Sequence, residues 1–232
     1  MIEDPPLLTI KKTLRRPSSA QIKAFEGVPS AVASDAMAGG SAMSSAVRHL
    51  DGGQRLPATA YGPALTVESG PADLYALLAA LKFLQPGDMV VSAFGGYQKC
   101  AHIGDKMANF MKNSGAAGFV TDGPIRDLHD VLPVGLPIWC SGLAPATPFE
   151  NGPGKIGLPI LVDGLHIENG DMIIADLDGV TVVPFDQIDD VAAKSAEILR
   201  LESDLDVEVA NGLKRPDIVD EWVAGDRVKW VD

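Results

Sequence analysis

Three charged residues in the middle of the chain, Asp105, Arg126 and Asp127, are of types that can bind a small acid and a cation together. Arginine binds carboxylates through paired, charge-assisted hydrogen bonds. Two aspartates beside a bound anion would repel it by about 4 kcal/mol per close pair at an effective dielectric near 20. A bound cation is therefore needed to offset this repulsion. Oxygen ligands favour Mg²⁺ or Mn²⁺. Together these residues predict a pocket for a small carboxylic acid and a divalent metal.

A predicted βαβ unit positions these residues. Residues 86–94 (PGDMVVSAF) have the apolar run of a buried strand, a helix is expected from near Gly104 to about Ser114, and residues 117–121 (AGFVT) form the next strand. Ligands bind at the carboxyl ends of parallel strands. We therefore expect the loop at Gly95 and Gly96, and the loop 122–124, to open into the same pocket as the three charged residues.

The apolar spacing of the predicted helix orients Asp105. Its core stripe is expected to consist of Ile103, Met107, Phe110, Met111 and Ser114. Asp105 lies roughly 200° around the helix from Ile103 at about 100° per residue, so it points away from the core. If the first turn begins near Gly104, the free amides of Lys106 and Met107 open into the pocket and can bind a carboxylate.

The spacing of these residues alone does not distinguish a binding pocket from simpler structural roles. Arg126 and Asp127 can form a surface ion pair or a helix cap, and Asp105 can be an ordinary acidic residue at a helix start. His129 and Asp130 either support the pocket from behind or are exposed. His102 and His166 lack metal-ligand spacing and are expected to be packing or surface residues.

The remaining segments predict one α/β domain. Short apolar runs bounded by Gly, Pro and Asp predict further elements. They comprise helices at 18–26, 29–37, 72–84 and 185–202, and strands at 58–69, 137–143, 158–162, 171–176 and 179–184. We expect an N-terminal arm with a short helix at 1–28, the domain at 29–203, and a polar C-terminal tail at 204–232.

Composition limits the classes of partner. The net charge of −12 argues against a nucleic-acid binder. The basic residues Lys11, Lys12, Arg15 and Arg16 either attract an anion or form a solvated arm. The sequence has neither a signal peptide pattern nor an apolar run of bilayer length, so no membrane contact and a cytoplasmic location are expected.

Two other patterns carry little functional weight. Cys100 and Cys140 lie in apolar segments without metal-ligand spacing and are expected to be buried thiols. Residues 152–157 (GPGKIG) match the dinucleotide pattern GxGxxG, but they lead into a strand rather than a helix, which argues against such a site.

The chain resembles the RraA-like family over most of residues 29–184. The resemblance is strongest from Pro86 to Leu143, and it extends through SAVASDAM and YGPALTV upstream and LPILVDGLHIENGDMIIADLDGVTVVP downstream. In the aldolase branch of that family, an Asp precedes an Arg-Asp pair by twenty intervening residues, as Asp105 precedes Arg126-Asp127 here. The resemblance implies a layered β/β/α sandwich of the swivelling-domain type with a parallel βαβ core.

The resemblance also implies a role for each site residue. Asp127 would ligate Mg²⁺ or Mn²⁺ directly, Asp105 would hold the metal through a water, and Arg126 would contact an oxo or hydroxyl oxygen of the substrate. The backbone amides of Lys106 and Met107, beside Gly104, would bind the substrate carboxylate. A glutamate from a neighbouring subunit completes the family's site. The candidates for it here are Glu197 and Glu202, and a homotrimer or homohexamer is expected.

The implied activity is that of a class II, metal-dependent pyruvate aldolase. Such an enzyme cleaves 4-hydroxy-4-methyl-2-oxoglutarate (HMG) or 4-carboxy-4-hydroxy-2-oxoadipate (CHA) to pyruvate and a second oxo acid, with the metal acting as a Lewis acid. Oxaloacetate decarboxylation is expected as a side activity because it passes through the same pyruvate enolate. The alternative is a non-catalytic, RraA-like protein that binds and regulates a ribonuclease.

Overall fold

The computed structural model describes residues 6–231. The chain divides into two compact units, one ending at Ser195 and the other beginning at Ala196. The first unit contains every strand of the described chain and the predicted pocket residues. The second contains the outer part of helix α6 and helix α7. Each unit is therefore described by itself.

The strands of the first unit form one large sheet and one small one. They are β1 (Leu8–Ile10), β2 (Arg48–His49), β3 (Ala60–Glu68), β4 (Met89–Ala93), β5 (Gly118–Thr121), β6 (Ile138–Cys140), β7 (Gly154–Ile156), β8 (Ile160–Val162), β9 (Leu165–Ile167), β10 (Met172–Ala175) and β11 (Val180–Val183). The large sheet has the order β1-β7-β3-β4-β5-β6-β2, with β10 paired to β3 and β11 to β10. The strands from β3 to β6 run parallel, as the βαβ pattern predicted.

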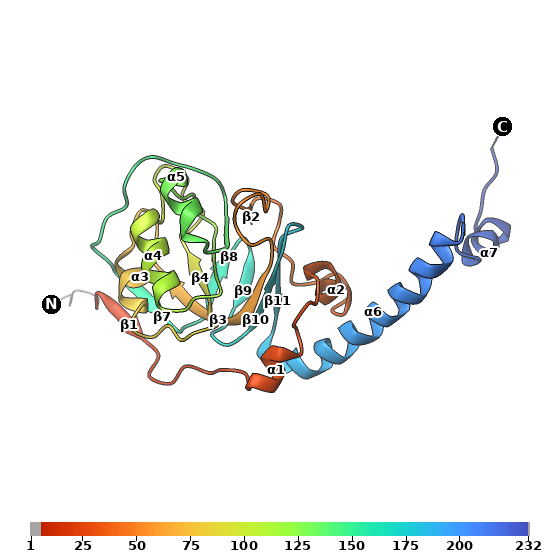
Figure 1. Cartoon of the computed structure of the whole chain (residues 1–232), viewed down its shortest axis with the longest axis horizontal. Coiled ribbons are helices and arrows are strands. Elements are labelled where there is room, and N and C mark those ends of the chain that lie inside the picture. Colours follow the sequence, from red (N-terminus) through yellow and green to blue (C-terminus); the bar gives the residue numbers. More distant parts are fainter. Residues whose placement is uncertain (1–5, 232) are drawn as a thin grey trace. The chain divides into compact units, whose positions relative to one another are not determined.

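Helices and strands cover opposite faces of the parallel strands (Figure 1). The helices are α1 (Ser19–Lys23), α2 (Ser30–Asp35), α3 (Tyr75–Ala80), α4 (Asp105–Asn113), α5 (Leu128–Val131), α6 (Ile188–Ala210) and α7 (Ile218–Ala224). Short 3₁₀ turns occupy Leu132–Val134 and Phe185–Gln187. Helices α3 and α4 pack on one face, and strands β8 to β11 lie on the other.

Strand β4 shows why both faces are covered. Val90 belongs to the core beneath α3 and α4, whereas Met89 and Val91 belong to the core shared with β8 to β11. Alternate side chains of a strand point to opposite faces, so a continuously apolar strand requires apolar cover on both sides. The predicted layered β/β/α sandwich is confirmed.

Several local predictions were wrong or incomplete. Phe110 was assigned to the core stripe of α4, but 48% of it is exposed, whereas Met107 and Met111 are buried as predicted. Helix α3 begins at Tyr75 rather than beside Pro71. The glycine-rich segment before Leu158 contains strand β7, which leads onward without a helix, so the argument against a dinucleotide site holds. Both cysteines are buried and free, as expected.

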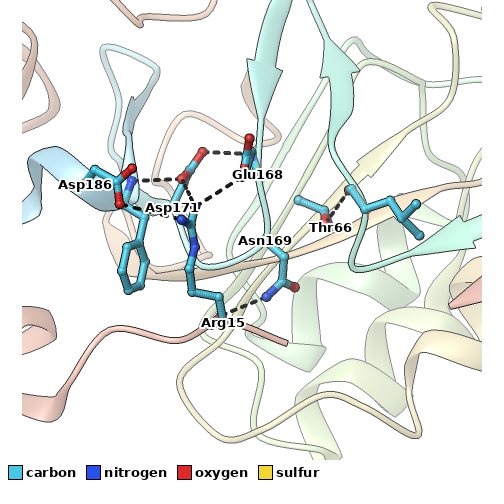
Figure 2. Close-up of polar contacts among 8 residues, drawn as sticks. Arg15, Thr66, Glu168, Asn169, Asp171 and Asp186 are labelled. Carbon is cyan, nitrogen blue, oxygen red and sulfur yellow. Dashed lines mark hydrogen bonds and ion pairs between the residues drawn. The ribbon is translucent and has the colours of Figure 1, made fainter. Parts of the chain in front are cut away.

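The N-terminal arm is bound to the body of the first unit, so its arginines are not simply solvated. Strand β1 pairs in parallel with β7. The Arg15 guanidinium lies over the Phe185 ring and near the carboxylates of Glu168, Asp171 and Asp186, at 3.3, 3.7 and 3.6 Å (Figure 2). The Asn169 amide donates to the Arg15 carbonyl at 2.8 Å. Arg16 pairs with the buried Asp88.

The second unit is helical and exposed. Helix α6 buries Ile188, Val191 and Ser195, and its residues from 200 to 210 are all exposed. The tail, left without assigned structure by the sequence, is helical to Ala210 and again over α7. Glu197 and Glu202 are both exposed. None of the helices within residues 6–231 combines the length and hydropathy of a bilayer span.

Candidate functional site

The first wall of the site is the amino end of α4. Gly104 caps the helix with extended backbone (φ −131°, ψ −164°), and Asp105 is the first helical residue. A carboxylate in the first turn is favoured by the helix dipole. The Asn109 side chain donates to the Asp105 carbonyl at 2.9 Å, which ties the first turn together. As predicted, Asp105 points away from the core beneath α4 and toward a cavity.

The second wall follows β5. Arg126 N–H donates to the Ile103 carbonyl at 3.0 Å, and Ile103 and Ile125 form a parallel bridge, so the two loops are joined by their backbones. Asp127 has left-handed backbone (φ 58°) and caps α5. This conformation is uncommon outside glycine, and Asn and Asp tolerate it best. The backbone thus turns sharply where the Asp127 side chain must face α4.

Gly104 lets the two walls approach closely. A Cβ atom added to Gly104 would overlap the Asp127 Oδ2 atom and would lie 3.2 Å from Arg126 Nε. The Gly104 backbone conformation itself is open to any residue. Glycine is therefore required here for space and not for backbone freedom.

These walls enclose a cavity of about 220 Å³. Pockets for drug-sized ligands usually measure about 300–1,000 Å³, so this one suits a smaller molecule. Its polar side consists of Gly104, Asp105, Lys106, Arg126 and Asp127. Its apolar side is formed by Leu74, Leu78, Met107 and Phe110. The structure thus brings Asp105, Arg126 and Asp127 together at one cavity, as predicted.

Asp105 and Asp127 each contact a cation from the neighbouring residue. Lys106 Nζ lies 2.6 Å from Asp105 Oδ2, and Arg126 Nε lies 3.2 Å from Asp127 Oδ2. The hydrogen bond from Lys106 lowers the pKa of Asp105, and the same contact raises the pKa of Lys106. Asp105 is therefore ionised at neutral pH and available to a cation.

A third wall was not predicted from the sequence. The strap, residues 141–153, joins β6 to β7 and lines the cavity with Thr147, Pro148 and Glu150. The buried Asp73 carboxylate accepts backbone hydrogen bonds from Asn151 and Gly152 of the strap, at 2.6 and 3.0 Å. Asp73 thereby holds the strap against the start of α3. This role was not predicted from the sequence, because Asp73 falls inside the helix predicted at 72–84.

The expectation of one shared pocket was wrong for both loops, because none of residues 95, 96 and 122–124 lines the cavity at α4. Gly95, Gly96 and Asp122 line a separate cavity of about 590 Å³ together with Arg48 of β2. The Asp122 carboxylate accepts hydrogen bonds from the Phe94 and Gly96 amides at 2.6 and 2.7 Å, and burial raises its pKa. Asp122 therefore holds the loop at Gly95 and Gly96 in place rather than reaching the site at α4.

His102 is a fully buried packing residue that borders the cavity. It stacks on Phe94 at 4.2 Å between ring centroids, its Nδ1 lies 2.8 Å from Thr121 Oγ1, and its Nε2 lies 3.3 Å from Ser92 Oγ. Its amide donates to the Pro124 carbonyl at 2.7 Å, which links the two loops of the site. Burial lowers the pKa of His102 to about 3, so its ring is neutral at pH 7. His129 and Asp130 are exposed and do not line the cavity.

The neutral state of His102 predicts a loss of stability in mild acid. His102 takes up a proton near pH 6.5 in the unfolded chain but only near pH 3 in the folded chain. Its contribution to the free energy of unfolding is therefore complete above pH 6.5 and declines as the pH falls. Between pH 6.5 and 5 the expected loss is roughly 2 kcal/mol. Urea unfolding of the wild type and of His102→Gln at several pH values would measure it.

Comparing how the free energy of unfolding changes with pH in the wild type and in His102→Gln isolates the contribution of His102. Asp88, Asp122 and Asp171 have pKa values raised by burial, which favours the folded state as the pH falls, but both proteins share them. The wild type is expected to lose stability more steeply than His102→Gln between pH 6.5 and 5. Equal slopes would show that His102 is not buried in its neutral form.

The donor set at the cavity fits a hard divalent cation. Within residues 6–231 no three His, Cys, Asp or Glu side chains converge as a complete metal cage. Mg²⁺ does not need one, because it retains several waters and is usually held by one or two carboxylates together with oxygens of the substrate. Asp105 and Asp127 supply two such carboxylates. Because Gly104 has no Cβ, the Asp127 carboxylate can lie close to the amino end of α4.

Solved structures place the fold in a known class. The chain resembles Streptomyces coelicolor RraAS2, described as an unusual member of the RNase ES inhibitor RraA protein family, with a TM-score of 0.74 and 28% identity over 83% of this chain and 100% of that one. An uncharacterised protein from Pseudomonas syringae has a TM-score of 0.73 and 22% identity over 85% and 96% of the two chains. The fold is therefore that of the RraA-type α/β proteins.

Sequence comparison gives the family. The RraA-like family model, described as Aldolase/RraA, matches residues 30–182. A Halalkalibacterium halodurans protein provisionally named as a 4-hydroxy-4-methyl-2-oxoglutarate aldolase is 36% identical over 75% of this chain and 81% of its own length. The chain belongs to the RraA-like family.

Proposed function

We propose that the protein is a divalent-metal-dependent lyase that cleaves a 4-hydroxy-2-oxo acid of the HMG or CHA type to pyruvate and a second oxo acid. The observation that carries this proposal is the convergence of Asp105, Arg126 and Asp127 on one small cavity at the amino end of α4. The aldolase name given to the Halalkalibacterium halodurans relative supports the same activity.

The residues of the cavity divide the binding of a pyruvyl group among them. The amides of Lys106 and Met107, at the start of α4, would receive its carboxylate. The Arg126 guanidinium would donate to its oxo or hydroxyl oxygen. Bound together, these donors fix the substrate with its distal end toward the cavity mouth, and the apolar wall at Leu74, Leu78 and Phe110 excludes water from one side.

Mg²⁺ or Mn²⁺ fits this arrangement, with Asp127 as a direct ligand and Asp105 holding a water beside it. Bound there, the cation would supply Lewis-acid stabilisation of the negative charge that develops on the pyruvyl oxygen. Asp105 would orient this water, which would accept the proton of the C4 hydroxyl as the C3–C4 bond breaks and would then return a proton to the pyruvyl methylene carbon. No Schiff base with a lysine is needed.

The neighbouring-subunit contribution remains a prediction. Glu197 and Glu202 lie on the exposed stretch of α6, where a carboxylate is free to enter the site of another copy. We infer a homotrimer or homohexamer in which one of these two residues completes the site. Sedimentation velocity measures the assembly, and Glu197→Gln and Glu202→Gln should differ in their effect on activity.

The proposed function is tested with the full chain, Mg²⁺ and three acids: HMG, CHA and oxaloacetate. Pyruvate release that EDTA abolishes and Mg²⁺ restores is the expected result with at least one of them. Oxaloacetate decarboxylation alone would support the site but not the substrate class. No pyruvate from any of the three acids would overturn the proposal.

A non-catalytic ribonuclease regulator is the second candidate, and the description of Streptomyces coelicolor RraAS2 favours it. Such a role needs surface complementarity and no metal. It is favoured if the protein forms a complex with a ribonuclease, inhibits it equally with and without EDTA, and releases no pyruvate.

A further inference from the structure

Lys106 has a side chain that the proposed function leaves unused. Only its backbone amide is assigned to the substrate, yet its ammonium lies 2.6 Å from the Asp105 carboxylate at the mouth of the cavity. The Lys106 side chain is 83% exposed, whereas that of Asp105 is only 18% exposed. The ammonium therefore sits on the solvent side of a carboxylate that faces inward.

This ion pair is one that can open easily. Adjacent residues on a helix do not face each other, so the lysine side chain must bend back to reach Asp105. Holding a long side chain in one conformation costs entropy, and exposed ion pairs contribute little to stability. A divalent cation that interacts with the Asp105 carboxylate competes with the Lys106 ammonium and releases it.

The released Lys106 ammonium is positioned to bind a second negative charge on the ligand. Among the described residues that line the cavity, Arg126 and Lys106 are the cations. Arg126 lies beside Asp127, where the pyruvyl group is proposed to bind. The rest of the lining includes the neutral Thr147, the acidic Glu150 and the apolar Leu74, Leu78 and Phe110, none of which carries a positive charge.

We propose that Lys106 recognises the distal carboxylate of a dicarboxylic 2-oxo acid, and that in the metal-free protein it occupies the Asp105 carboxylate instead. This inference rests on the proposed function, and it assigns a residue to the second carboxylate that HMG, CHA and oxaloacetate all carry at the end remote from the pyruvyl group. Lys106 then sets specificity and does not take part in bond cleavage.

The first test measures metal affinity without substrate or turnover. Mn²⁺ is titrated into the wild type, Lys106→Met and Lys112→Met, and the free ion is followed by electron paramagnetic resonance. Lys112 is the matched control because it lies on the same helix, carries the same charge and donates to the Gly135 carbonyl outside the cavity. We expect Lys106→Met to bind Mn²⁺ about two- to fivefold more tightly, because an exposed competing pair is lost.

The second test compares two stable five-carbon acids that differ only at the distal end, 2-oxoglutarate and 2-oxopentanoate. Their binding to the Mn²⁺-saturated proteins is measured by calorimetry. Lys106→Met is expected to bind 2-oxoglutarate about tenfold more weakly and 2-oxopentanoate with unchanged affinity. Lys106→Arg should retain the preference for 2-oxoglutarate, because it keeps a cation at the cavity mouth.

The outcomes separate this inference from the proposed function. Equal weakening of both acids in Lys106→Met, no preference of the wild type for 2-oxoglutarate, or the same Mn²⁺ affinity change in Lys112→Met would overturn the role of Lys106. The proposed function fails on a different measurement, the absence of metal-dependent pyruvate release.

Discussion

Replacing Asp127 with asparagine is expected to lower kcat/KM for metal-dependent pyruvate release by about a thousandfold. Asp127 is the carboxylate proposed to hold the metal directly, and loss of that ligand removes several kcal/mol of charge stabilisation. Asparagine suits the test because the backbone at residue 127 is left-handed (φ 58°), a conformation that asparagine adopts more readily than alanine. Steady-state kinetics with HMG, CHA and oxaloacetate measures the effect.

Asp130→Asn provides the control. Asp130 lies three residues further along, is exposed, and is absent from the lining of the cavity, so the same loss of charge should change kcat/KM by less than about twofold. If Asp127→Asn kept more than a tenth of the wild-type activity, Asp127 would not be a metal ligand.

The second large effect is expected at Gly104. A methyl group there would overlap the Asp127 carboxylate, while the backbone conformation would accept alanine without strain. The end of a flexible side chain can move aside at little cost, so Gly104→Ala should fold normally. The displaced carboxylate and the crowded Arg126 guanidinium should then reduce kcat/KM by about a hundredfold, as small misplacements of reacting groups do.

Thermal unfolding and Mn²⁺ titration separate these two consequences. We expect Gly104→Ala to melt within a few degrees of the wild type and to bind Mn²⁺ more weakly. Gly40→Ala is the matched control, since a Cβ at Gly40 would meet only the Met37 carbonyl at an ordinary 3.4 Å. Full activity in Gly104→Ala would show that the close approach of the two loops is unimportant.

The central βαβ unit could be predicted because its local signals agree. The apolar run at 86–94 is too continuous for a strand with one solvated face, and β4 is indeed covered on both sides. Helix α4 begins after Gly104 and ends before Ser114, as expected. Once this unit is placed, the carboxyl ends of its strands bring Asp105 and Asp127 close together.

Features that depend on contacts between distant segments could not be predicted. Phe110 fits the helical period of the core stripe, but the stripe ends at the cavity, so the same position lines the cavity instead. Asp73 looks like an ordinary residue near a helix start, and its role arises only from the strap, 78 residues further along. The periodicity of a sequence gives the face of an element but not what lies opposite that face.

The pairing of β1 with β7 bears on the order in which the protein folds. Leu8 pairs with Gly154, so the two strands are separated by 146 residues of chain. Contacts between such distant segments require most of the chain to be ordered first, because closing a long loop costs entropy before any contact is gained. The strap that lines the cavity leads directly into β7 and therefore belongs to the last part of the molecule to become ordered. A refolding chain should recover its helix signal before it recovers the ability to bind its ligand.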